Sequence, residues 1–157
     1  MNYIIREMKK SEYPLLSDFL YESIFQRDEK RLIPRSVLKL PTFNVYIENF
    51  GNQKDDICLC AEIDNKVVGA VWSRLIHGFG YVDMETPELA IALYKEYRGQ
   101  GIGKNMMYQM LEKLKERGFK KISLSVQKDN YALRMYQSVG FKITKEKEEE
   151  YIMECNF

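Results

Sequence analysis

The fold is decided by one hexapeptide, Arg98-Gly99-Gln100-Gly101-Ile102-Gly103, which stands between an apolar strand-like run and the start of a helical stripe. Glycine lets a backbone approach a ligand closely and adopt conformations that a side chain forbids. The free N–H groups in the first turn of a helix, together with its dipole, favour a phosphate group, and Arg98 and Lys104 add positive charge there. A plain strand-to-helix turn is the alternative, but three glycines within five residues exceed what such a turn requires. The stretch therefore predicts a phosphate-binding loop.

The residue pattern of this loop excludes two common phosphate-binding motifs. A dinucleotide-binding G-x-G-x-x-G motif would need glycine where Lys104 stands. A P-loop would need glycine at Arg98 and serine or threonine at Asn105. The pattern that fits is [QR]-x-x-G-x-[GA], which is filled by Arg98, Gly101 and Gly103.

That pattern resembles the pyrophosphate loop of the GCN5-related N-acetyltransferase (GNAT) superfamily. Residues 86–103 are similar to the strand, bulge and loop of that family, and residues 124–141 are similar to its second signature. Two independent motifs at the expected separation make the resemblance specific over residues 86–141. The hairpin around Val68-Gly69-Ala70 is also similar, whereas the first 50 residues carry little motif information.

Hydrophobic periodicity predicts an α/β (α+β mixed) chain with the element order β-α-α-β-β-β-α-β-α-β-β. We expect a single domain over residues 1–157, with a GNAT-like, mostly antiparallel mixed sheet of about six to seven strands flanked by about four helices. The expected strands are 3–7, 57–63, 67–76, 89–94, 120–127, 141–144 and 151–157. The expected helices are 11–26 (capped by Ser11), 34–51 (split by Pro41), 102–117 and 129–140, and a loop over 77–87 holds a short strand at its centre.

The resemblance implies coenzyme-binding roles for three groups of residues. Backbone groups of Leu93, Tyr94 and Lys95 are expected to meet the pantetheine arm of coenzyme A, although the family often has proline where Lys95 stands. Asn130 and Tyr136 match family positions that meet this arm and the leaving sulfur. The pyrophosphate is expected to be wrapped by the loop amides, namely those of Arg98, Gly99, Gln100, Gly101, Ile102, Gly103 and Lys104.

Acetyl transfer to an amine needs few other groups. The amine must be neutral to attack a thioester, so a base takes its proton directly or through water. The carbonyl oxygen becomes anionic, and a strand amide near Leu93 is expected to stabilise it. The departing thiolate needs a proton, and the resemblance implies that Tyr136 is this general acid. The alternative is a packed helix aromatic, because Ala132, Met135 and Val139 share its side of the helix.

Glu88 is the candidate for the base. Alternation along the strand places it on one face with Ala90 and Ala92, whose small side chains leave room for a ligand. Some members of the resembling family carry a glutamate on the neighbouring strand, where this sequence has Ser125. The alternatives are that Glu88 makes only structural hydrogen bonds and that water accepts the proton.

Composition limits the classes of partner. The chain has 24 Lys+Arg against 23 Asp+Glu, a net charge of +1, which predicts no broad attraction to nucleic acid or to a membrane surface. The N-terminus lacks the features of a signal peptide, and no span approaches transmembrane length. Cys58, Cys60 and Cys155 are expected to be buried thiols in a reducing cytoplasm, because a metal site would need more partners than the distant His77. We therefore expect a cytoplasmic protein without a metal.

The expected function is acetyl-CoA-dependent N-acetylation of a primary amine by direct attack in a ternary complex, with a small-molecule amine as the acceptor. The alternatives are acetylation of a protein N-terminus or lysine, and a non-catalytic module that senses coenzyme A. Homodimers are common in the resembling family, but the sequence itself does not determine the oligomeric state. Asp83 and Glu85 are alternative groups for attracting a cationic amine. Residues 11–50 are expected to build most of the acceptor pocket, with aromatic surface from Tyr13, Phe19, Tyr21, Phe25, Phe43 and Tyr46.

Overall fold

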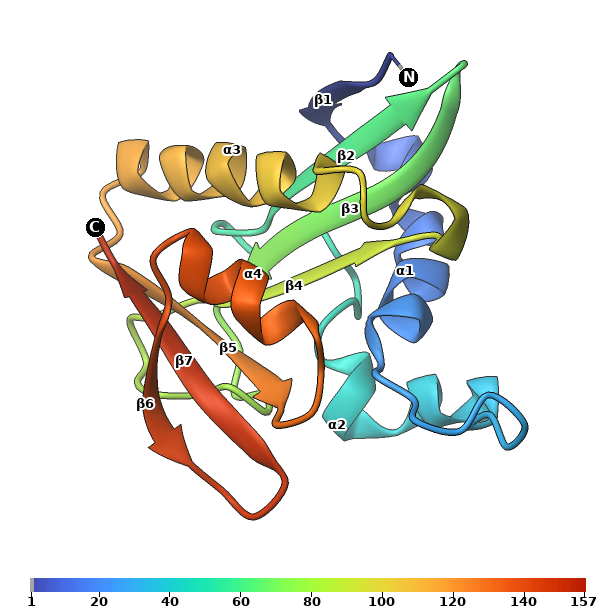
Figure 1. The fold of residues 1–157 in the computed structure, drawn as a ribbon. Helices are drawn as coiled ribbons and strands as arrows, with labels where there is room; N and C mark the ends of the chain where they lie inside the picture. The colour runs from blue at the N-terminus through green and yellow to red at the C-terminus, as the bar shows by residue number, and fades with distance from the viewer. Residues whose placement is uncertain (1) are drawn as a thin grey trace.

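The computed structural model describes residues 2–157 and contains one seven-stranded sheet in the order β1-β2-β3-β4-β5-β7-β6 (Figure 1). All neighbouring strands are antiparallel except β4 and β5. The predicted GNAT-like α/β fold is confirmed. The strands are β1 Ile4–Glu7, β2 Ile57–Ile63, β3 Lys66–Arg74, β4 Glu88–Leu93, β5 Lys121–Gln127, β6 Lys142–Glu146 and β7 Glu150–Asn156. The α-helices are α1 Leu16–Ser23, α2 Pro41–Asn44, α3 Ile102–Glu116 and α4 Ala132–Ser138, and 3-10 helices span Lys10–Leu15, Arg35–Lys39 and Lys95–Tyr97.

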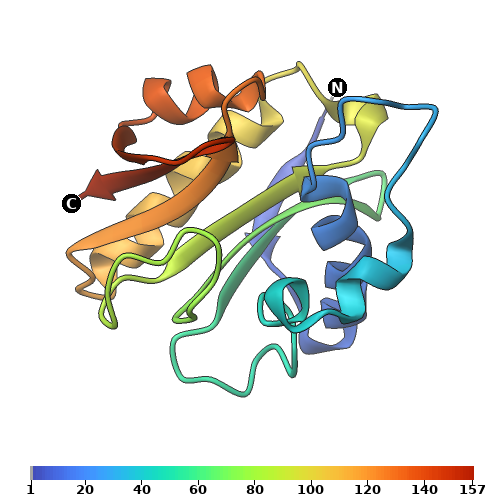
Figure 2. The same ribbon diagram turned by 90° about the horizontal axis from the view of Figure 1, so that it is seen from below.

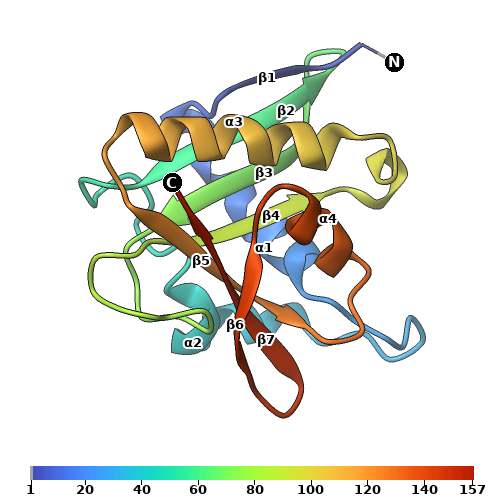
Figure 3. The ribbon, with the colours of Figure 1, turned by 60° about the vertical axis from the view of Figure 1, so that its left-hand side comes forward.

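The sheet separates two hydrophobic layers. Helices α3 and α4 cover one face, and α1 and α2 cover the other, as Figures 2 and 3 show. Successive side chains of β4 point alternately into the two layers, so Leu89 packs toward α3 whereas Ala92 packs toward α1. Cys58 and Cys60 also share the α1 layer, as their spacing of two predicts. The central strand is therefore buried on both sides, with its small residues on the α1 side.

Strands β4 and β5 are joined at one end only. Their ladder has a single residue pair, Glu88 with Ser123, whereas β5 and β7 are paired over seven positions. In Figure 1 the two strands diverge beyond this pair. Parallel pairing this short leaves backbone groups of both strands without a strand partner, which opens the middle of the sheet to a ligand.

The first helical region differs from its prediction. Ser11 is not the cap: the 3-10 helix begins at Lys10, and the Glu12 carboxylate accepts the backbone N–H of Lys9 at 2.8 Å. The α-helix then starts at Leu16 and ends at Ser23 instead of Gln26, since Ile24 is already extended. The split at Pro41 is confirmed, because this proline begins α2 after the 3-10 helix Arg35–Lys39, but α2 ends at Asn44 instead of continuing to residue 51.

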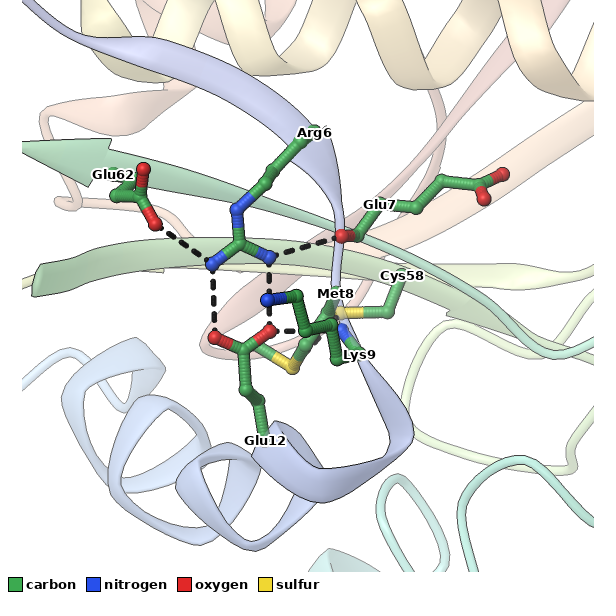
Figure 4. A network of polar contacts seen from close by, with 7 residues as sticks. All are labelled: Arg6, Glu7, Met8, Lys9, Glu12, Cys58 and Glu62. Carbon is green, nitrogen blue, oxygen red and sulfur yellow. Dashed lines mark hydrogen bonds and ion pairs between the residues drawn. The ribbon is translucent and has the colours of Figure 1, made fainter. Parts of the chain in front are cut away.

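One ionic network ties this first helical region to the sheet (Figure 4). The guanidinium of Arg6 on β1 donates to both carboxylate oxygens of Glu12, at 2.9 and 2.8 Å, and to Glu62 on β2 at 2.9 Å. The hydrogen bond from Arg6 is the largest cause that lowers the pKa of Glu12, to about 2. The network therefore fixes the start of the chain on the edge of the sheet.

A second, buried ion pair holds the segment between α2 and β2. The side chains of Arg74 on β3 and Asp56 are 2% and 1% exposed, and their two contacts measure 2.9 and 3.1 Å. Arg74 also donates to the carbonyl of Val45 at 3.0 Å, and Asp56 accepts the N–H of Gly51 at 2.8 Å. This pair therefore fixes the position of the neighbouring Tyr46.

Candidate active site

The glycine loop presents its backbone to solvent. Gly99 and Gly101 have φ values of +75° and +85°, a conformation that side chains rarely adopt. A Cβ built on either residue would meet nothing within 4 Å, so the glycines are needed for their backbone angles and not for packing. Helix α3 starts directly after Gly101 without a side-chain cap, so the N–H groups of its first turn are unsatisfied within the helix. The loop thus fits a phosphate group, as the sequence predicts.

The positive charge at this loop is not arranged as the sequence suggests. Arg98 donates to the carbonyl of Leu93 at 2.9 Å and forms an ion pair with Glu22 at 3.0 Å. It therefore anchors the loop to β4 and α1. Lys104 is exposed and has no ion pair within residues 2–157, so it is the cation that stays available to an anion.

The end of β4 leaves one of the predicted backbone groups available. The N–H of Tyr94 donates to the carbonyl of Val68 at 3.0 Å, so it is already used inside the sheet. Because N–H groups alternate in direction along an antiparallel ladder, the N–H groups of Leu93 and Ile91 point toward β5. Strand β5 has diverged there, so the amide of Leu93 faces the gap. Lys95 is exposed, and its ammonium pairs with Glu29 at 3.0 Å.

A cavity of about 420 Å³ lies at this gap and is lined from both faces of the sheet. Ala90 and Val126 line it from β4 and β5. Tyr136 and Asn130 contribute from the α4 side, and Phe43 contributes from the α1 side. Residues of the two motifs are thus brought to the same space as Phe43, which comes from the region without a motif.

Tyr136 and Asn130 are brought together at the cavity, as the sequence predicts. The hydroxyl of Tyr136 has no hydrogen bond within residues 2–157, and its ring packs against Phe141 at 6.1 Å between centroids. Burial raises the pKa of Tyr136 to about 12, so the phenol stays protonated at neutral pH. The side-chain oxygen of Asn130 accepts the N–H of Ala132 at 2.9 Å, which leaves the NH₂ group of the amide available. Both side chains therefore offer a hydrogen-bond donor to a ligand.

Glu88 lies behind the cavity wall and does not line it. It is 2% exposed, and its carboxylate accepts three hydrogen bonds: from the N–H of Gly78 at 2.6 Å, the N–H of Gly80 at 2.8 Å and the hydroxyl of Tyr46 at 2.8 Å. Burial is the largest influence on its pKa, which is raised above the ordinary glutamate value. Tyr46 does line the cavity, so it stands between Glu88 and any ligand there.

The loop 77–87 contains no strand, contrary to the prediction, because Gly78 and Gly80 bond to the Glu88 side chain instead of to a neighbouring strand. Between these glycines, Phe79 points its ring at Phe43, with centroids 5.3 Å apart, and lines the cavity. The sequence signal that indicates Phe79 is a large apolar residue between two glycines in a loop.

Only some predicted acceptor residues reach the cavity. Phe25, Phe43 and Tyr46 line it, whereas Tyr13, Phe19 and Tyr21 do not. Asp83 and Glu85 also lie outside the lining. The carboxylate of Asp83 instead accepts hydrogen bonds from the hydroxyl of Thr86 and from the N–H of Glu85, at 2.8 and 2.9 Å.

Segment 24–33 crosses the rim of the cavity and is tied to both diverging strands. Arg27 donates to Gln127, the last residue of β5, at 2.9 Å and pairs with Asp129 just beyond this strand. Glu29 pairs with Lys95, beyond the end of β4.

Within residues 2–157 we find no cluster of three or more potential metal ligands of the His, Cys, Asp and Glu types. No helix in that range has the length and hydropathy needed to cross a membrane.

Comparisons with known proteins agree with this architecture. Two curated relatives are a probable N-acetyltransferase, camello, of Xenopus laevis, 33% identical over 98 residues, and the acetyltransferase SG1711 of Sodalis glossinidius, 31% identical over 98 residues. These alignments cover 61% and 62% of this chain but only 43% and 65% of the two relatives. The crystal structure of the PaiA N-acetyltransferase from Thermoplasma acidophilum in complex with coenzyme A superposes with a TM-score of 0.72 at 22% identity, and covers 100% of both chains.

A family model extends this likeness over most of the sequence. The model of the acetyltransferase (GNAT) family matches residues 18–141, a range that includes most of α1, the glycine loop and α4. The chain belongs to the acetyltransferase (GNAT) family.

Proposed function

We propose that this protein is an acetyl-CoA-dependent N-acetyltransferase that transfers the acetyl group to a small primary amine by direct attack in a ternary complex. The observation that carries the proposal is the cavity at the β4–β5 gap, which both layers line. A donor on the α4 side and an acceptor on the α1 side meet there. None of the three cysteines lines the cavity, which favours direct attack over a thiol-bound acyl enzyme.

The residues that would hold the coenzyme are those with unused donors. The N–H groups of Ile102, Gly103 and Lys104 fit the pyrophosphate, and the Lys104 ammonium adds charge. The N–H of Leu93 and the amide of Asn130 fit the pantetheine arm. The thioester supplies an acyl carbon that a neutral amine attacks. A strand N–H that faces the gap then stabilises the charge on the carbonyl oxygen.

Tyr136 is proposed as the general acid. Its raised pKa keeps the proton on the phenol at neutral pH, and its hydroxyl has no competing partner within residues 2–157. It gives this proton to the sulfur as the carbon–sulfur bond breaks, and solvent restores it afterwards.

Glu88 is proposed as the final proton acceptor, acting through Tyr46. As the carbon–nitrogen bond forms, the amine proton passes to the Tyr46 oxygen while the hydroxyl proton of Tyr46 passes to Glu88, 2.8 Å away. This relay explains how a carboxylate outside the cavity lining can serve a reaction inside it. Water at the cavity rim is the competing acceptor.

The test of the general acid follows thiol release from acetyl-CoA over a panel of amines, with Tyr136→Phe beside the wild type. We expect kcat to fall by about a hundredfold or more, with unchanged acetyl-CoA affinity, since the ring remains. Tyr131→Phe is the matched control, because Tyr131 is 68% exposed and lies outside the cavity lining. A full rate in Tyr136→Phe refutes the general acid. Tight acetyl-CoA binding without amine-stimulated release would favour a coenzyme-A sensor.

The test of the relay is the pH dependence of kcat/KM. Glu88 accepts a proton only when ionised, and burial raises its pKa, so the rate should rise with pH through a value above the ordinary glutamate range. Both Glu88→Gln and Tyr46→Phe should lose this acidic limb. A limb that persists in both variants would assign the proton to water.

A further inference from the structure

We infer that the acceptor is a monoamine with a flat, apolar, ring-bearing body, and that Phe79 sets this preference. The inference rests on the proposed function and deepens it. Three rings form the acceptor wall: the Phe79 and Phe43 centroids are 5.3 Å apart at an interplanar angle of 60°, and Phe79 and Tyr46 are stacked at 6.3 Å and 15°. All three line the cavity. Aromatic walls of this kind bind ring-bearing ligands through offset and edge contacts.

The position of the Phe79 backbone is fixed before any ligand binds. The residue is 37% exposed, although a large apolar side chain gains by burial. Its N–H donates to the Tyr46 hydroxyl at 2.8 Å, and that hydroxyl donates to Glu88. The Glu88 carboxylate also binds the N–H groups on both sides, those of Gly78 and Gly80. Three backbone hydrogen bonds, from Gly78, Phe79 and Gly80, thus fix this loop, so Phe79 loses little entropy when it meets a ligand.

The two glycines that flank Phe79 allow this geometry. A Cβ on Gly78 would lie 2.4 Å from the Tyr46 hydroxyl oxygen, and a Cβ on Gly80 would lie 2.7 Å from the backbone carbon of Leu124. Each contact is closer than atoms tolerate, so only glycine fits at either position. The close packing of the two glycines therefore holds Phe79 next to Phe43 at the cavity.

The charges around the cavity disfavour a polycationic acceptor. The lining contains two basic residues, Arg27 and Arg31, and two acidic ones, Asp28 and Glu150. None of the four belongs to the aromatic wall, and Arg27 is already paired with Asp129. A polyamine would need several carboxylates of its own, because each ammonium group that leaves water requires a partner. A monoamine carries only the reacting nitrogen, which is neutral when it attacks the thioester, so it needs no further carboxylate.

The experiment measures thiol release from acetyl-CoA with three probe amines: 2-phenylethylamine, n-butylamine and spermidine. For the wild type we expect kcat/KM with 2-phenylethylamine to exceed that with n-butylamine by about tenfold or more. In Phe79→Ala, KM for 2-phenylethylamine should rise about tenfold with little change in kcat, and n-butylamine should be almost unaffected. Phe157→Ala is the matched control, since Phe157 is also 37% exposed but does not line the cavity.

The outcomes separate this inference from the function on which it rests. A preference for spermidine or n-butylamine, or an equal loss for both monoamines in Phe79→Ala, overturns the inference and leaves the acetyltransferase proposal standing. If no amine stimulates release, the proposed function fails. In that case, calorimetric titration of the coenzyme A complex with 2-phenylethylamine tests whether the aromatic wall binds a ring. Binding that is lost in Phe79→Ala supports the inference. Absence of binding to the wild type overturns it. Unchanged melting temperature and acetyl-CoA affinity show that Phe79→Ala is folded.

Discussion

The proposed coenzyme side of the site, at the glycine loop and α4, and its proposed acceptor side, at α1, α2 and the loop 77–87, are stabilised by different kinds of interaction. On the coenzyme side the determining features are backbone ones: the positive φ values of Gly99 and Gly101 and the free N–H groups at the start of α3. On the acceptor side they are side-chain contacts across long sequence separations, such as Tyr46 with Glu88. Local backbone rules govern the first, and tertiary partners govern the second. The two sides should therefore fail differently when they are mutated.

The largest effect is expected on the acceptor side, from Asp56→Ala. This change leaves the buried guanidinium of Arg74 without its carboxylate, and breaking a buried pair in this way costs about 3–5 kcal/mol in the free energy of unfolding. Urea unfolding measures it. Asp18→Ala, which breaks the exposed pair with Arg35, should cost less than about 1 kcal/mol. Equal losses of unfolding free energy in the two variants would show that burial does not make the Arg74–Asp56 pair more important than the exposed pair.

An intermediate effect is expected on the coenzyme side, from Gly101→Ala. The new Cβ meets no atom within 4 Å, so the cost comes from the backbone angle alone, about 1–2 kcal/mol. Gly103→Ala is the control: it has no positive φ, and its Cβ would make an ordinary 3.6 Å contact with Leu93. The free energy of unfolding of Gly103→Ala should therefore equal that of the wild type or exceed it. If both alanines destabilise the protein equally, packing rather than backbone conformation determines this loop.

The smallest effect is expected at the network that anchors the first helical region. The folded-state pKa of Glu12 is lowered from 4.5 to about 2, so its stabilisation is present above pH 4.5 and is lost as the pH falls from there toward about 2. Glu12→Gln should remove this dependence and cost about 1 kcal/mol or less near pH 7, because solvent screens the pair. Urea unfolding at a series of pH values tests it. Parallel curves for wild type and variant would contradict the assignment.

The comparison also explains how far the sequence predicts the structure. The helix predicted over 102–117 is observed as Ile102–Glu116, because its apolar stripe and terminal glycines are local signals. The helix predicted over 11–26 is wrong at both ends: Glu12, held by Arg6 and by the N–H of Lys9, lies in a 3-10 helix at the start, and the chain is already extended at Ile24. A contact between the helix and a strand lies outside any local pattern.

The same limit applies to the candidate site. Tyr136 and Asn130 are predicted by their motif, and both line the cavity. Alternation correctly places Glu88 on the face of Ala90 and Ala92. It does not predict that the loop around Phe79 folds over the carboxylate and removes it from the cavity lining, because that arrangement depends on Tyr46, 42 positions earlier in the chain.

The single pair that joins β4 to β5 has a consequence for hydrogen exchange. The N–H groups of Ile91 and Leu93 lie in the middle of a seven-stranded sheet, yet they point toward a strand that has moved away. In the free protein these two amides should exchange with deuterium much faster than the amide of Ala92 between them, which is paired with β3. A ligand in the gap would take the place of the missing strand and slow both. Exchange at Ile91 and Leu93 thus reports whether a ligand occupies the gap between β4 and β5.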